Sequence, residues 1–439
     1  MLNDTICAIS TSLANGAIAI VRMSGEESFN IIKDIAHLSD DKIKANHLIY
    51  AHIYEDDEVI DEVLISFFYA SHSYTREDIV EINCHGGVYI TRKILNLLIQ
   101  KGARLAENGE FTKRAYLNGR IDLANAEAIN DLINANNRYQ AKSAIKGIDG
   151  SIQRLLEPLL NDMKNVLAMI EVNIDYPEYE DEVDMSQNKI KPYLLKWTTS
   201  FKEMIDKAER FRVVKDGLKT VIIGKPNVGK SSLLNALLEK EKAIVTDVAG
   251  TTRDLVEGHV NLKNTSLHLI DTAGIRESED IVEKIGIEKS KEALKEADLV
   301  ILVLDASKEL EAIDEELLEL SKDKRRIIVY NKADIKGHEG ISISAMNHDI
   351  KPLTDAIDKM FEEDVILADE DVLNNERQIA LMKRALSEID IALKDIEDTP
   401  IDVIYTSIME SYHYLSDILG REYREDLIDH MFRNFCLGK

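Results

Sequence analysis

Hydrophobic positions change their spacing along the chain, and each spacing is typical of a different element. Near the start, short runs rich in Ile, Val, Phe and Tyr predict strands at residues 5–11, 17–22, 47–54, 58–69 and 78–83. Apolar residues at helical spacing predict helices at residues 28–36 and 88–100. We therefore expect an α+β domain, and we place it at residues 1–118.

Long amphipathic stretches follow this domain. Apolar residues with a period of 3.6 extend from Ile148 to Ile170 and again from Ile190 to Phe211, with an acidic turn between them. Similar patterning returns after residue 372. We interpret these stretches as one helical domain, residues 119–215 plus 372–439, interrupted by an inserted domain. The period does not distinguish a bundle that closes within one chain from one that closes across a dimer.

Strands and helices alternate over residues 217–370, which predicts a doubly wound α/β sheet. Gly224 to Ser231 fits the pattern G-x-x-x-x-G-K-[ST], between an apolar strand and an apolar helix start. That context is typical of a phosphate-binding loop rather than of a chance Gly-rich turn. Lys230 would meet the β- and γ-phosphates, and the Ser231 hydroxyl would ligate Mg²⁺.

Further motifs in the expected order indicate a guanine nucleotide. Asp271 follows a strand and would hold Mg²⁺ through water, and Thr252 would be a direct Mg²⁺ ligand. A buried Asp334 could accept hydrogen bonds from N1–H and the 2-amino group of guanine, whereas adenine lacks both donors. The predicted GTP contacts are Asn227, Val228, Gly229, Lys230, Ser231, Ser232, Thr246, Asp247, Val248, Ala249, Gly250, Thr251, Thr252, Asp271, Thr272, Ala273, Gly274, Asn331, Lys332, Asp334, Ser344 and Ala345.

One position departs from the Ras-like pattern. Ras-like GTPases place Gln after the Asp-Thr-Ala-Gly stretch to orient the attacking water, and this chain has Ile275 there. Glu283 is a candidate to act through an intervening water, with an exposed helix-cap charge as the alternative. The side-chain oxygen of Asn227 could hold a monovalent cation that supplies the missing positive charge.

Composition limits the partners and the compartment. The 439-residue chain has a formal net charge of −26, which argues against a broad nucleic-acid-binding face. An RNA partner would need a local basic patch or a basic helper protein. The three cysteines lie far apart, which suggests a reduced compartment and no zinc site. Without a basic N-terminal region or a long apolar run, we expect a soluble cytoplasmic protein with no signal peptide or membrane span.

The whole chain resembles the MnmE or TrmE family of tRNA-modification GTPases. The resemblance rests on segments beginning at Asp4, Val21, Tyr74, His85, Gly109, Leu123, Asp247 and Glu283, and on the terminal Phe435-Cys436-Leu437-Gly438-Lys439. The terminal Cys-x-Gly-Lys is the most specific of these. One departure lies at the second strand, where the family's Gly-Gly is Gly16-Ala17.

The resemblance implies a tetrahydrofolate one-carbon donor (5-formyl or methylene) in the N-terminal domain, which would also form a constitutive homodimer. The implied folate contacts are Arg22, Glu81, Arg120 and Lys439; the implied K⁺ ligands are Asn227, Thr246, Val248 and Thr251; the implied Mg²⁺ ligands are Ser231 and Thr252; and Glu283 is the implied water-orienting glutamate. Taken singly, Arg22, Glu81 and Arg120 also fit solvated surface charges.

The family works with a flavoprotein partner, MnmG (GidA), which would make most of the tRNA contacts. Together they would add an aminomethyl-type group to C5 of the wobble uridine, with K⁺-dependent dimerisation of the GTPase domains driving hydrolysis. Cys436 is a candidate catalytic nucleophile, or else a small apolar residue on a helix. The competing hypothesis is a regulatory or ribosome-assembly GTPase without modification chemistry; the terminal motif and the N-terminal domain favour the modification enzyme.

Overall fold

The computed structural model describes residues 4–44, 47–175, 187–240, 258–269, 294, 297–362, 364–394, 396, 400–421, 432, 435 and 438. The chain forms two compact units. One contains residues 1–130, 148–150 and 413–439, and the other contains residues 131–147 and 151–412. This division joins the last residues to the N-terminal unit, and the three predicted domain boundaries stay a prediction.

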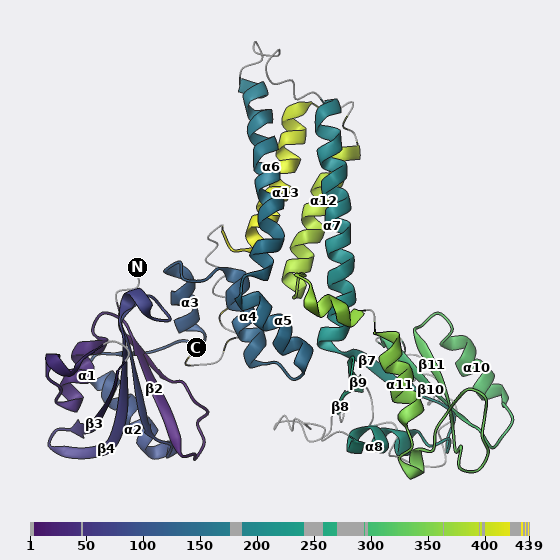
Figure 1. The fold of residues 1–439 in the computed structure, drawn as a ribbon, viewed down its shortest axis with the longest axis horizontal. Coiled ribbons are helices and arrows are strands. Elements are labelled where there is room, and N and C mark those ends of the chain that lie inside the picture. Colours follow the sequence, from purple (N-terminus) through teal and green to yellow (C-terminus); the bar gives the residue numbers. More distant parts are fainter. Residues whose placement is uncertain are drawn as a thin grey trace. The chain divides into compact units, whose positions relative to one another are not determined.

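A six-stranded sheet forms the centre of the first unit (Figure 1). Its order is β3-β4-β5-β2-β1-β6, with β1 and β6 parallel and the other neighbours antiparallel. The strands are β1 (Ile6–Ile9), β2 (Ile18–Ser24), β3 (Leu48–Glu55), β4 (Glu58–Phe68), β5 (Ile79–His85) and β6 (Arg104–Leu105). The five predicted strands are confirmed to within a few residues. Strand β6 was not predicted, because two exposed residues carry no periodic signal.

Helices α1 (Ser28–Ala36) and α2 (Val88–Gln100) have the predicted bounds and share one hydrophobic core with the sheet. Met23 and Phe67 point into that core from β2 and β4. The opposite face of β1 packs against Phe111 of α3 (Glu110–Leu117). Arg22 lies opposite Ala8 in the β1–β2 register, and therefore on the α3 face of the sheet.

The last residues of the chain pack within the same unit. The Tyr116 hydroxyl of α3 donates to the Gly420 carbonyl at 2.6 Å, and the amide of Leu123, which begins α4 (Leu123–Ile133), donates to the Leu419 carbonyl. Phe432 and Phe435 are buried against Ala126 of α4. The C-terminal segment is therefore part of the N-terminal unit's packing.

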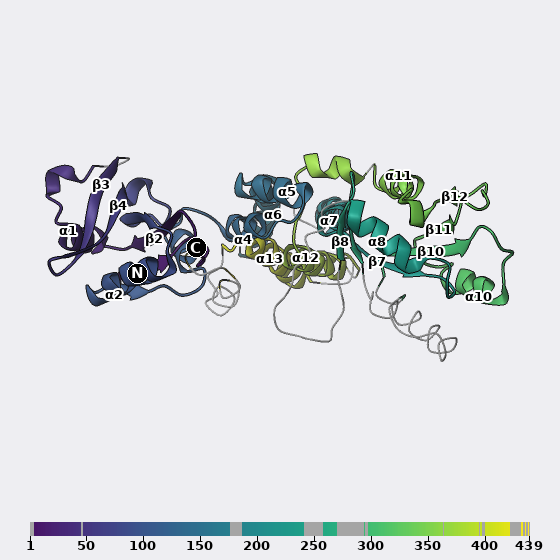
Figure 2. The same cartoon turned by 90° about the horizontal axis from the view of Figure 1, so that it is seen from below.

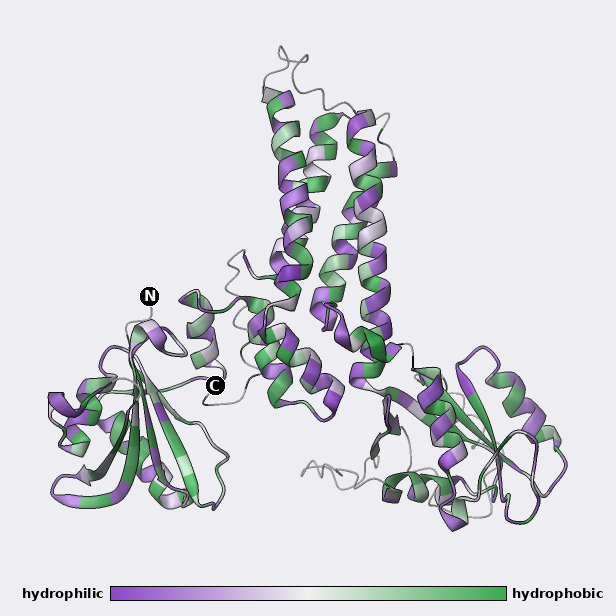
Figure 3. Ribbon diagram, in the orientation of Figure 1, coloured by the Kyte–Doolittle hydropathy of each residue, from purple (hydrophilic) through white to green (hydrophobic). Residues whose placement is uncertain are grey.

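The second unit contains long helices that stand side by side (Figures 1 and 2). The long helices are α6 (Ser151–Asp175), α7 (Gln187–Asp216), α12 (Glu376–Lys394) and α13 (Ile401–Ile418), the last of which extends into the first unit. The shorter helix α5 (Arg138–Ile148) precedes α6 in the sequence. Figure 3 shows green hydrophobic and purple hydrophilic positions alternating along these helices. Trp197 of α7 is fully buried and donates to Asp162 of α6 at 2.9 Å. The predicted apolar stripes are confirmed, except that Ile148 ends α5 and is exposed.

Between α7 and α12 in the sequence lies a second six-stranded sheet, of order β12-β11-β10-β7-β9-β8. Its neighbours are parallel except β8 and β9. The strands are β7 (Leu218–Ile223), β8 (Gly258–Asn261), β9 (Ser266–Leu269), β10 (Leu299–Asp305), β11 (Arg326–Asn331) and β12 (Ile341–Ser342), and the helices are α8 (Lys230–Lys240), α10 (Ala312–Leu320) and α11 (Lys351–Met360). The predicted α/β architecture, inserted between helical segments, is confirmed.

Four short 3₁₀ helices, at Asp40–Lys42, Ala70–His72, Ala345–Asn347 and Asp364–Asp369, complete the described elements. Among the described helices, none combines the length and the apolarity that crossing a membrane requires.

Candidate functional site

The predicted phosphate-binding loop connects β7 to α8, and Lys230 is the first residue of that helix. Gly224 has φ +156°, and a Cβ there would lie 2.5 Å from the Val303 carbonyl oxygen. Gly229 has φ +95°, and a Cβ there would lie 2.2 Å from Nδ2 of Asn331. Only glycine fits both positions, so the loop can approach β10 and β11 closely.

Lys230 is held at the mouth of this loop. Its Nζ donates to the carbonyl oxygens of Gly224 and Lys225, both at 2.8 Å. Burial lowers the pKa of Lys230. Asn227 in the loop and Ser231 in the first turn of α8 are exposed. Backbone amides and the helix dipole at the start of a helix favour a bound phosphate.

Asn331 joins two of the predicted motifs through its side chain. Its Nδ2 donates to the Val228 carbonyl of the phosphate loop at 2.8 Å, and its Oδ1 accepts from the Ala345 amide at 3.0 Å. Since β7, β11 and β12 belong to the parallel part of the sheet, their carboxyl ends meet at one edge. The described parts of the predicted nucleotide site are therefore brought together.

Asp334 is exposed, whereas the sequence argument assumed a buried carboxylate. The Ser344 hydroxyl donates to its Oδ1 at 2.6 Å. The sequence argument concerns the carboxylate with guanine bound, and the loop after β11 lies at the rim of the sheet, where a bound base would cover Asp334. The bond from Ser344 brings the Asp334 and Ser344 motifs together in the structure.

Lys332 is oriented by a buried carboxylate. Its Nζ lies 2.7 Å from Oδ2 of Asp305, whose other oxygen accepts two bonds from Ser307. Burial alone would raise the pKa of Asp305, but the bonds from Lys332 and Ser307 outweigh it and lower the pKa to about 2. Asp305 is therefore ionised at neutral pH and fixes the lysine beside the Asn331 backbone.

Several predicted site residues lie outside the described residues. They are Thr246, Asp247, Val248, Ala249, Gly250, Thr251, Thr252, Asp271, Thr272, Ala273, Gly274, Glu283, Cys436 and Lys439. Their predicted roles stay predictions.

A second set of predicted residues converges on the α3 face of the N-terminal sheet. Arg22 of β2 and Glu81 of β5 are cross-strand partners, and their side chains pair at 2.7 Å while staying about one-fifth exposed. The Arg22 guanidinium lies 5.7 Å from the centre of the Phe111 ring, and that of Arg120 lies 4.7 Å from the Tyr74 ring. The three predicted folate contacts in the described chain are thus grouped around two aromatic rings.

The end of the chain reaches the same strand pair. The Ser10 hydroxyl donates to the Gly438 carbonyl at 3.1 Å. Gly438 has φ +90°, and a Cβ there would lie 2.4 Å from the Ile9 carbonyl oxygen. Because Ile9 pairs with Val21, the residue before Arg22, Gly438 docks next to the Arg22 strand.

Sequence reasoning missed Tyr74, Phe111 and Ser10 as members of this region. Tyr74 donates to or accepts from Thr112 at 2.9 Å, and burial raises the pKa of Tyr74. Tyr74 and Phe111 both lie in segments that carry the family resemblance, which is the signal that could have found them. Ser10 had no such signal, because its partner lies at the other end of the chain.

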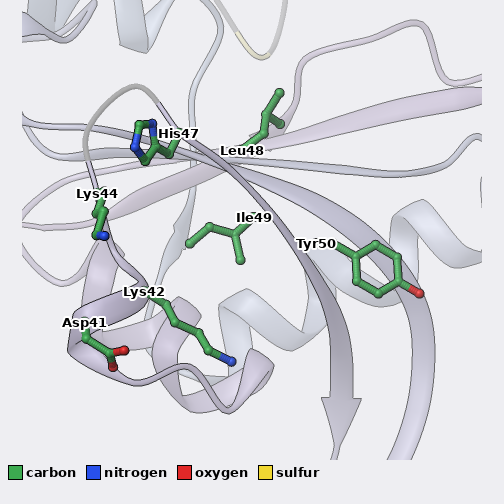
Figure 4. A pocket seen from close by; sticks show the side chains of 7 residues that line it. All are labelled: Asp41, Lys42, Lys44, His47, Leu48, Ile49 and Tyr50. Carbon is green, nitrogen blue, oxygen red and sulfur yellow. The ribbon is translucent and has the colours of Figure 1, made fainter.

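A cavity of about 620 Å³ lies at the outer edge of the N-terminal sheet (Figure 4). It is lined by Asp41, Lys42, Lys44, His47, Leu48, Ile49 and Tyr50. None of these lining residues is a predicted nucleotide or folate contact.

Comparison with known proteins assigns both parts of the chain to one family. The model for the MnmE helical domain matches residues 123–436, and the model for the GTP-binding protein TrmE N-terminus matches residues 5–120. Among solved structures, Era in complex with MgGDPNP and a 16S ribosomal RNA segment aligns with 39% of this chain and 66% of that chain, at 27% identity and a TM-score of 0.26. A TM-score of 0.26 does not indicate a shared overall fold.

Two curated relatives extend over nearly the whole chain. The protein named tRNA modification GTPase MnmE in Lactococcus lactis subsp. cremoris (strain SK11) is 47% identical over 456 residues, covering 99% of this chain and 98% of that protein. The protein of the same name in Streptococcus gordonii (strain Challis) is 44% identical over 451 residues, covering 99% of both. The chain therefore belongs to the MnmE (TrmE) family.

Proposed function

We propose that this chain is a K⁺-activated GTPase that acts in tRNA modification. With a flavoprotein partner of the MnmG (GidA) type, it adds an aminomethyl or carboxymethylaminomethyl group to C5 of wobble uridine in certain tRNAs. A tetrahydrofolate bound to the N-terminal domain supplies the one-carbon unit. K⁺-dependent dimerisation of the GTPase domains, residues 217–370, drives hydrolysis in a homodimer whose other domains are residues 1–118 and residues 119–215 plus 372–439.

The observation that carries the GTPase assignment is the Asn331 bridge. Asn331 bonds to the phosphate loop through Val228 and to the Ser344-Ala345 turn through Ala345. Ser344 in turn donates to Asp334. An Asp carboxylate at this edge can accept both guanine donors. The name of the two relatives, tRNA modification GTPase, supports the same activity and a tRNA substrate.

The described residues fit the proposed cations. The exposed Ser231 hydroxyl at the first turn of α8 suits Mg²⁺, which prefers oxygen ligands. Asn227 is exposed in the left-handed conformation, with φ +59°, within the phosphate loop, and its side-chain oxygen is a suitable ligand for K⁺. Bound cations would supply positive charge beside the phosphates, and Lys230 and the α8 amides would orient the γ-phosphate.

The N-terminal site fits a folate in its chemistry. Glu81 can accept from the donor edge of a pterin, and Arg120 can meet an anionic glutamate tail. The Tyr74 and Phe111 rings give flat apolar surface beside these charges. The docked Gly438 lies two residues from Cys436 in the sequence, which supports a role for the terminal motif near this site.

We expect GTP hydrolysis to be about ten-fold or more faster in K⁺ than in Na⁺. Ile275 cannot orient the attacking water, and K⁺ would supply positive charge that the site otherwise lacks beside the phosphates. Turnover of the purified full chain in matched chloride salts tests this. Asn227→Gly tolerates the positive φ and should bring the K⁺/Na⁺ ratio close to one. Asp56→Gly, at another exposed position with positive φ, should leave the ratio unchanged. Equal wild-type rates in both salts would refute K⁺ activation.

A further inference from the structure

We propose that Lys225 is a positioning residue of the phosphate-binding loop, anchored in the first turn of α10, and that this anchor sets the affinity for the nucleotide. The inference rests on the proposed GTP site and adds a residue to it. Lys225 occupies one of the unspecified positions of the loop pattern, so the motif alone assigns it no role.

The anchor is a buried ion pair between distant segments. Lys225 Nζ lies 2.8 Å from Oδ2 of Asp314 and 3.0 Å from Oε1 of Glu311. Lys225 is 8% exposed and Asp314 is 2% exposed, whereas the Glu311 side chain is largely exposed. Asp314 is therefore the principal partner, because exposed partners contribute little.

The pair is mutually dependent. Burial alone would lower the pKa of Lys225, but its bonds to Asp314 and Glu311 outweigh burial and raise it, so the ammonium stays charged. Asp314 Oδ2 also accepts from the Glu311 amide at 3.0 Å, whereas the buried Oδ1 has no hydrogen-bond partner within the described structure. Removing the ammonium would leave a buried carboxylate without its counter-charge.

The backbone of Lys225 links this anchor to the phosphate lysine. The carbonyl oxygens of Gly224 and Lys225 hold Lys230 Nζ, both at 2.8 Å. On one side, Gly224 approaches the Val303 carbonyl closely; on the other, Pro226 restricts the conformation of Lys225. The side chain of Lys225 therefore fixes the turn whose carbonyls place Lys230. Without it, the loop amides and Lys230 would lose their fixed arrangement before the nucleotide binds.

The test measures the GTP and GDP dissociation constants, kcat, and thermal unfolding of the nucleotide-free full chain. Lys225→Met should weaken both nucleotides by about ten-fold or more, with a smaller change in kcat at saturation. Lys225→Arg keeps a cation that can pair with Asp314 and should stay within about three-fold of wild type. Lys322→Met removes a cation paired with Glu319 on the surface and should change neither quantity.

A double variant separates positioning from simple stability. Lys225→Met with Asp314→Leu removes both buried charges, so it should recover the thermal stability that Lys225→Met loses while nucleotide binding stays weak. Recovery of affinity together with stability would overturn the positioning role, as would wild-type affinity in Lys225→Met. If the wild-type chain itself binds no GTP, the proposed function fails instead, so the two failures are distinguishable.

Discussion

Replacing Asp334 by Asn should weaken GTP binding by about 100-fold or more and improve binding of xanthosine triphosphate. The carboxylate can accept from both N1–H and the 2-amino group of guanine. The Asn side chain would direct its NH₂ group toward the 2-amino group of guanine, so two donors would face each other and neither would be paired. Xanthine carries a carbonyl oxygen at that position, which an Asn NH₂ can meet. Ser344, which donates to Asp334 Oδ1 at 2.6 Å, would keep the side chain oriented.

Competitive titration of the full chain with GTP, ATP and xanthosine triphosphate measures this change. Asp323→Asn makes the same chemical change at an exposed position before β11, whereas Asp334 follows β11. It should leave the nucleotide preference unaltered. If Asp334→Asn kept its preference for GTP, the base would be recognised by residues other than those at the carboxyl ends of β11 and β12.

Replacing Arg114 by Met should destabilise the N-terminal unit by about 3–5 kcal/mol, because it breaks a buried network of charges. Arg114 is 1% exposed and donates to the carboxylates of Asp4 at 2.7 Å and Glu110 at 3.0 Å, and to the Asp4 carbonyl at 2.8 Å. Glu77 lies 3.2 Å away. The methionine side chain fills similar space but leaves Glu110, itself buried, with one cation fewer.

The loss is measurable in urea through hydrogen exchange of the β1 and β2 amides. Lys101→Met removes an exposed cation paired with Asp34 and should cost much less. Equal losses in the two variants would contradict a buried network.

The same network gives a pH dependence. Burial would raise the pKa of Glu110, but bonds from Arg104, the Glu107 amide and Arg114 outweigh it and lower the pKa below 4.5. A carboxyl group whose pKa is lower in the folded state than in the unfolded state stabilises the fold. This stabilisation is fully present above the unfolded-state pKa and is lost as the pH falls through the folded-state pKa. The difference between wild type and Arg114→Met should therefore shrink below about pH 4.

The sequence was most informative where a period or motif determines the structure locally. Helix α2 was predicted with its bounds because Ile94, Leu97 and Leu98 lie on one helical face and Gly102 follows its end. The proximity of the nucleotide motifs in space was predictable because the carboxyl ends of the strands in a parallel sheet share one edge.

The parts that could not be predicted depend on contacts between distant residues. The Lys225–Asp314 pair joins positions 89 apart, and Ser10 meets Gly438 across 428 positions. No local pattern specifies either pairing. The exposure of Asp334 depends on the rim of the sheet rather than on the residues around it in sequence.

In the proposed function, GTP hydrolysis by this chain serves the modification of wobble uridines. The most direct test is mass spectrometry of wobble nucleosides in tRNA from cells that lack the chain. We expect these cells to lose the C5 aminomethyl-type groups, to regain them with the wild-type chain, and not to regain them with Lys230→Ala. An unchanged set of wobble uridine modifications in cells that lack the chain would contradict it.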